Sequence, residues 1–266
     1  MRKIIRGLAR RLLKMLHSLI TCPMPKWYLE RGHEAYAKLM EYVRQNPFYA
    51  VAYAAAQGVS APYEVQLRAV EELAMQDPAE LADNPSLAEE IFEKVGAIDR
   101  ERRAKVMARG ARCYLEICGP DPEKCLTDQE TRLALADCMF PPDPRIKGEY
   151  EGGKKSRDLL LLMLGDPEAV PVDRHVDRWI CKVAKLYCPT KHEPGGRIPP
   201  SEYQKVQEAV RNVAEACGTT PGEMMVSAWV YGMCHSRIKR TKFPIVDDYY
   251  IYCQPTLEEW TEENWG

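Results

Sequence analysis

The chain has 266 residues, of which 45% are hydrophobic, and its formal net charge is −2. This length and composition are typical of a globular protein with one large domain or two small lobes. No run of about 18 uncharged apolar residues occurs, so we expect no membrane-spanning helix, and the near-neutral charge argues against a uniformly basic surface.

Basic and acidic residues are nonetheless concentrated in separate parts of the chain. Residues 1–16 carry six Lys or Arg and no acid, whereas the tail from Asp247 to Glu263 carries six carboxylates and no Lys or Arg. A second basic cluster consists of Arg237, Lys239, Arg240 and Lys242. Because DNA affinity depends on a local basic face, this cluster is a candidate for phosphate contacts, and a solvated face is an interpretation of equal standing.

These differences suggest three parts, namely a basic arm at 1–28, a helical domain at 29–243 and an acidic tail at 244–266. Residues 1–20 have the apolar spacing of a helix with arginines on the opposite face. A membrane-surface or organelle-targeting helix has this pattern too. We favour a plain basic arm, which ends at the prolines 23 and 25.

The ten cysteines form no C-x-x-C pair, which argues against a zinc ribbon or a thioredoxin-like motif. No secretory signal with a small-residue cleavage site is evident. We therefore interpret most of the cysteines as small buried side chains, with disulfides as the minority alternative.

Ten segments between 31 and 236 show helical apolar periodicity, and prolines mark many of their boundaries. They are 31–45, 47–57, 62–76, 86–95, 99–117, 127–138, 154–164, 173–187, 201–216 and 221–236. No alternating β-branched run competes with them, and no repeat of 30 to 45 residues recurs. The sequence therefore predicts an all-α domain, whose longest non-periodic central segment is 139–153.

The segment that follows, 152–176, has the features of a functional site. Gly152 and Gly153 precede a very apolar helix that ends at Gly165, and an extended Ala-Val-Pro-Val piece leads to Asp173. Asp173 is expected to cap the next helix. Taken alone, an aspartate at this position is most often structural, because it satisfies backbone N–H groups.

The pattern G-x-K, an apolar helix and then A-V-P-V-D-x-H-V resembles the helix-hairpin-helix DNA glycosylase superfamily, which includes endonuclease III and 8-oxoguanine DNA glycosylase. The piece D-P-E-A-V-P-V-D at 166–173 is most similar to the latter branch. Residues 47–57 are similar to the family's helix that ends in a Gln-containing, DNA-facing turn. Residues 89–96 with 102–105 are similar to a further helix pair, so the resemblance covers about 35–190.

The resemblance implies a two-lobed all-α fold with a cleft, and a base-excision repair enzyme that flips a damaged base, an oxidised purine being one candidate. Asp173 matches the family's catalytic aspartate, which stabilises positive charge on the deoxyribose. A lysine at the start of the apolar helix attacks C1′ in bifunctional members, which also cleave the strand. We favour Lys155 over Lys154, because Lys154 would place Asp158 where the family is apolar.

The same resemblance implies DNA contacts. Gln57 is a candidate to enter the duplex, the alternative being a polar residue at a helix end, and His175 is a candidate phosphate contact, the alternative being a structural role. The full set of DNA-binding candidates is Gln57, Gly152, Gly153, His175, Arg237, Lys239 and Arg240. We expect a monomer that binds damaged double-stranded DNA without metal or cofactor, in the cytoplasm, nucleoid or nucleus.

The sequence departs from the family in two places. The hairpin before the helix is longer and more acidic than the family's apolar-x-Gly-apolar-Gly-x-Lys pattern. Cys181 and Cys188 have the first spacing of the family's iron–sulfur motif, but no further pair follows. The rival hypothesis is a non-catalytic helical DNA- or protein-binding module on the same scaffold, and such a module need not keep Asp173 and a lysine facing each other.

Overall fold

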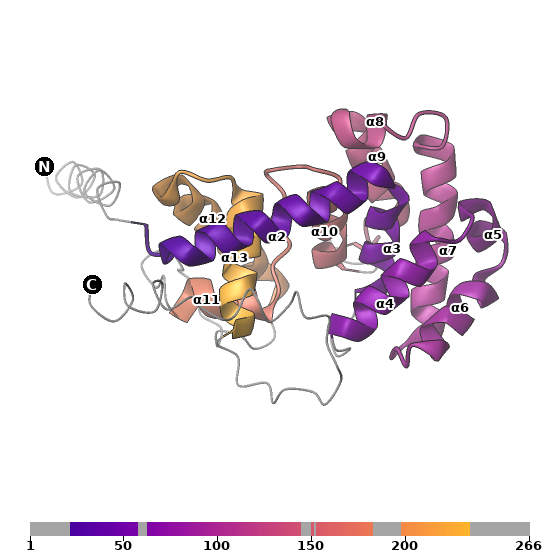
Figure 1. Ribbon diagram of the computed structural model, residues 1–266, viewed down its shortest axis with the longest axis horizontal. Helices are drawn as coiled ribbons and strands as arrows, with labels where there is room; N and C mark the ends of the chain where they lie inside the picture. Colours follow the sequence, from indigo (N-terminus) through magenta and orange to yellow (C-terminus); the bar gives the residue numbers. More distant parts are fainter. Residues whose placement is uncertain (1–21, 58–62, 145–149, 152, 183–197, 235–266) are drawn as a thin grey trace, which may run out of the picture. The chain divides into compact units, whose positions relative to one another are not determined.

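The computed structural model describes residues 22–57, 63–144, 150–151, 153–182 and 198–234 (Figure 1). Within these ranges every regular element is a helix, and the β-type pairing is confined to one isolated bridge between Pro142 and Tyr150. The predicted all-α class is confirmed. None of the described helices has both the length and the apolar character that crossing a bilayer requires.

The helices follow one another along the chain with short connections. They are α2 (Lys26–Gln45), α3 (Phe48–Ala56), α4 (Tyr63–Ala74), α5 (Pro78–Asp83), α6 (Pro85–Lys94), α7 (Arg100–Ile117), α8 (Lys124–Thr127), α9 (Gln129–Met139), α10 (Lys154–Met163), α11 (Arg174–Lys182), α12 (Pro200–Cys217) and α13 (Pro221–Cys234). Each predicted helix corresponds to one of them. The two helices without a predicted counterpart, α5 and α8, have six and four residues, too few to show periodicity.

The described residues divide into two compact units. One contains 22–33, 172–182 and 198–234, and the other contains the described residues between 34 and 171. The dividing points fall within α2 and between Pro171 and Val172. The cleft expected between two lobes stays a prediction. The expected basic arm and acidic tail lie largely outside the described residues.

The larger unit is organised around α3. Its sequence FYAVAYAAA buries eight of its nine residues, which is the pattern of a helix surrounded by others. It packs against α4, α7 and α10, and α7 in turn packs against α5, α6 and α9. Small residues permit close contact, since a Cβ atom at Gly110 would lie 2.7 Å from Val51 Cγ1 and 2.8 Å from Met139 Cε.

In the smaller unit α11, α12 and α13 pack against one another. Trp179, Val206, Val210 and Met224 are among its fully buried side chains. The first turns of α2 belong to the same unit, and Gly32 lies directly against Ser227 of α13. This contact brings two helix backbones close together.

We expect Gly32→Ala to destabilise the protein. A Cβ atom there would lie 2.6 Å from Ser227 Cα, a backbone atom that cannot move without shifting α13. Overpacking of this kind costs about 1–3 kcal/mol, which exceeds the roughly 1 kcal/mol that alanine gains over glycine in a helix. Urea unfolding measures the difference. Ala37→Gly at an exposed position of α2 is the control for propensity alone, and a stabilised Gly32→Ala protein would contradict the contact.

The structure corrects our interpretation of the cysteines. Three disulfides join described residues, namely Cys22–Cys217, Cys113–Cys138 and Cys118–Cys125, with sequence separations of 195, 25 and 7. Cys181 is disulfide-bonded as well. The partners in Cys22–Cys217 and Cys113–Cys138 are distant in sequence and are brought together by the folded chain, which is why their spacing did not indicate them.

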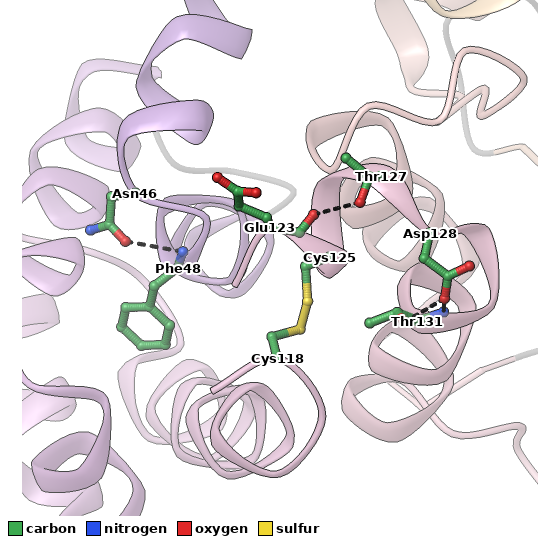
Figure 2. Close-up of a disulfide and its surroundings, with 8 residues drawn as sticks. All are labelled: Asn46, Phe48, Cys118, Glu123, Cys125, Thr127, Asp128 and Thr131. Atoms are coloured by element: carbon green, nitrogen blue, oxygen red, sulfur yellow. Dashed lines mark hydrogen bonds between the residues drawn. A yellow bond between two sulfur atoms is a disulfide. The ribbon is translucent and has the colours of Figure 1, made fainter. Parts of the chain in front are cut away.

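Figure 2 shows how one disulfide ties down a short connection. Cys118 follows the end of α7 and Cys125 lies in α8, so the bond closes the turn between these helices (Figure 2). The next helix, α9, is capped by Asp128, whose Oδ2 accepts from the backbone N–H of Thr131 at 2.9 Å. Hydrogen bonds from Thr131 lower the pKa of Asp128 below its ordinary value.

Candidate functional site

The first turn of α10 carries the two candidate nucleophiles. Gly153 precedes it with φ of 94°, a conformation that favours glycine, and supplies no side chain to cap the helix. Lys154 and Lys155 are both half-buried, and the turn contains no acidic residue. The positive end of this helix therefore bears two cations and no anionic side chain.

The described part of the hairpin before α10 is held by several contacts. The N–H of Glu151 donates to Pro141 O at 2.8 Å, and its carboxylate pairs with Arg109 at 2.9 Å. The guanidinium of Arg157 lies 4.6 Å from the centre of the Tyr150 ring. Glu151, one of the acidic residues of this hairpin, thus forms an ion pair within the protein. The candidate Gly152 lies outside the described residues.

The helix α10 is buried from Leu159 to the leucine that follows it, Leu164, as the apolar sequence predicts. It ends at Gly165, whose φ of 87° again favours glycine. The predicted extended piece, 169–172, is non-helical and buried. Its last residue, Val172, donates its N–H to Tyr203 Oη at 3.0 Å, which fixes the chain just before Asp173.

Asp173 caps α11 with one of its two carboxylate oxygens. Its Oδ1 accepts from the backbone N–H groups of His175 at 2.8 Å and Val176 at 2.9 Å. No described residue donates to Oδ2, and the side chain is half-buried. The structural role is therefore met by one oxygen, and the second oxygen is available for a different role.

The candidate His175 and the nearby Trp179 of α11 lie in the interior of their unit. His175 is 9% exposed and Trp179 is 1% exposed. The Trp179 ring contacts Tyr231 edge to face, with centroids 6.2 Å apart. This burial favours the structural interpretation of His175 over a phosphate contact, and it favours a core role for Trp179.

Gln57 lies where three helices of the larger unit meet. It follows α3 in an extended conformation, and the last carbonyl of α3, Ala56 O, accepts from Arg103 Nη1 at 2.6 Å. Gln57 lines a pocket together with Arg102 and Arg103 of α7 and Ser156 of α10. The structure thus brings Gln57 close to the helix start that carries the candidate lysines.

The pairing of Asp173 with a lysine is a separate question from the pocket of Gln57. Asp173 belongs to one unit and the two lysines to the other, so their pairing stays a prediction. Arg237, Lys239 and Arg240 lie outside the described residues. No protein-family model, no curated protein and no solved structure matches this chain. The resemblance to the glycosylases therefore rests on the residues that carry it.

Sequence reasoning did not single out Arg103 and Ser156 as site residues. A signal for Arg103 does exist, because it lies four residues before Met107 and eight before Ala111 on the buried stripe of α7. A cation at an apolar position must find a specific partner. Ser156 has no comparable signal, because its place in the pocket depends on how α10 packs against α3.

Proposed function

We propose that the chain is a DNA glycosylase of the helix-hairpin-helix type. The observation that carries the proposal is Asp173, which ends the A-V-P-V-D piece, caps α11 through Oδ1 and keeps Oδ2 without a described hydrogen-bond donor. A second support is Lys155, half-buried at the start of a buried apolar helix, with no described carboxylate in ion-pair contact.

In the proposed reaction the enzyme binds duplex DNA and flips the target nucleotide out of the stack. The uncharged amine of Lys155, or of Lys154, attacks C1′ of the deoxyribose, and the electrons of the glycosidic bond leave with the base. The Asp173 carboxylate offsets the positive charge that develops on the sugar. The amine then loses a proton, and the C1′–O4′ bond of the sugar opens as O4′ takes up a proton, which leaves a Schiff base between the lysine and C1′. This Schiff base permits strand cleavage by elimination of the 3′ phosphate, and Gln57 fills the vacated stack.

The disulfides favour the rival hypothesis of a non-catalytic helical binding module. Disulfides persist in oxidising compartments, whereas most DNA repair takes place in compartments that keep thiols reduced. A binding module for DNA or protein needs neither Asp173 nor a free amine. Such a module would retain the all-α scaffold but release no base from any duplex.

Binding and base release on a panel of single-lesion duplexes test the proposal. We expect release of at least one damaged base, and affinity that falls roughly tenfold or more between low and moderate salt, since several phosphate contacts release counterions. Charge reversal at Arg237, Lys239 and Arg240 should weaken binding to damaged and undamaged duplex alike. Salt-independent binding, or none, would favour a protein-binding module.

A further inference from the structure

A buried cation without a counter-ion lies in the larger unit. Arg103 is 3% exposed, and its Nε has no hydrogen-bond acceptor. Its Nη1 donates a hydrogen bond to Ala56 O. No carboxylate in the described part of the chain is within ion-pair distance of the guanidinium. The nearby acid, Asp99, pairs with Arg102 instead. Burial lowers the pKa of Arg103, because leaving water penalises the charged form.

The surroundings of Arg103 are suited to a negative charge. The pocket that it lines is also lined by Arg102, Gln57 and Ser156, and none of the described residues around it is acidic. Ser156 lies in the first turn of the ten-residue helix α10, whose positive end has no capping side chain. The backbone dipoles at the start of α10 and the two guanidinium groups therefore all favour a negative charge in the pocket.

The size of the pocket limits its occupant. The pocket is small and partly open to solvent, so it is suited to a compact ligand such as one tetrahedral oxyanion and not to a nucleobase. Guanidinium groups bind phosphate oxygens through paired N–H donors, which makes arginine the side chain best suited to this ligand.

We propose that this pocket binds one phosphate group, with Arg102 and Arg103 supplying charge and Ser156 supplying a hydrogen-bond donor. The inference goes beyond the proposed function, because it uses neither Asp173 nor the lysines. Two sources carry the same chemistry, a free phosphate ion and a backbone phosphate of DNA.

Calorimetric titration of the full chain with inorganic phosphate tests the site, at constant ionic strength set with chloride. Arg103 is not substituted, because it also holds the end of α3. We expect saturable binding that weakens about tenfold in Arg102→Gln, the scale of losing one charge-assisted contact. Lys105→Gln is the matched control, because Lys105 lies on the same helix, pairs with Glu101 and does not line the pocket. Ser156→Ala should weaken binding several-fold.

An undamaged duplex separates the two sources. If the phosphate belongs to DNA, phosphate competes with the duplex, and Arg102→Gln weakens duplex binding while lowering the salt slope by about one. If it is a free ion, duplex affinity is the same in Arg102→Gln and Lys105→Gln. Absence of saturable phosphate binding, or equal losses in these two variants, overturns the site. Base release is measured in a separate assay. Failure of the proposed glycosylase activity is therefore distinguishable from failure of the phosphate site.

Discussion

Asp173→Asn is expected to slow base release about a hundredfold or more while leaving the stability of the protein nearly unchanged. Asparagine caps a helix as well as aspartate does, so the amide oxygen can keep the bonds from the N–H groups of His175 and Val176. The substitution removes only the negative charge. Loss of one charge-stabilising group costs on the order of a hundredfold to a thousandfold in rate.

Comparison with a second cap separates catalysis from structure. Asp128 caps α9 through Thr131 in the same manner, so Asp128→Ala and Asp173→Ala should each cost about 1 kcal/mol of unfolding free energy. Only the substitutions at Asp173 should slow base release, as measured under single-turnover conditions. Full activity in Asp173→Asn, together with destabilisation in Asp173→Ala, would show that Asp173 is a structural cap alone.

Removal of the Cys113–Cys138 disulfide is expected to cause a large loss of stability. The bond joins α7 to α9 across 25 residues of sequence, and a loop of that length predicts about 3.5 kcal/mol from the entropy of the unfolded chain. The double substitution Cys113→Ala and Cys138→Ala tests it by urea unfolding under oxidising conditions. The Cys118–Cys125 disulfide closes a shorter loop, with a separation of 7. Its removal is expected to lower the free energy of unfolding by about 2.4 kcal/mol.

The thiol content of the unfolded protein provides an independent control. Under denaturing conditions without reductant, the six cysteines of the three disulfides and Cys181 should not react with a thiol reagent. After reduction all ten cysteines should react. If all ten already react before reduction, the disulfides do not form.

Helix positions could be predicted from the sequence because each helix buries a stripe of apolar residues. The leucines of α10 are the clearest case, since their burial and the turn at Gly165 follow from composition and chain order. The capping role of Asp173 follows in the same way from its position before α11. Short elements such as α5 carry no periodic signal, and its start depends on the local cap made by Asp77.

Features that depend on contacts between distant segments could not be predicted. The Cys22–Cys217 disulfide joins residues 195 positions apart, and only the packed chain brings them together. The pocket of Arg103 likewise depends on how the ends of three helices meet. The burial of an arginine is visible in the pattern of α7, but only the structure shows that no carboxylate of the described residues forms an ion pair with it.

Borohydride trapping tests the central claim most directly, because it reports the covalent bond between a lysine and the deoxyribose. When borohydride is present during incubation with a duplex whose damaged base the enzyme releases, the protein without substitutions should form a stable enzyme–DNA adduct. The adduct should vanish in Lys155→Gln and persist in Lys154→Gln. Loss in Lys154→Gln alone would make Lys154 the nucleophile, and base release without an adduct would indicate attack by water. Neither base release nor an adduct on any duplex of the panel would contradict the proposal that this chain is a DNA glycosylase.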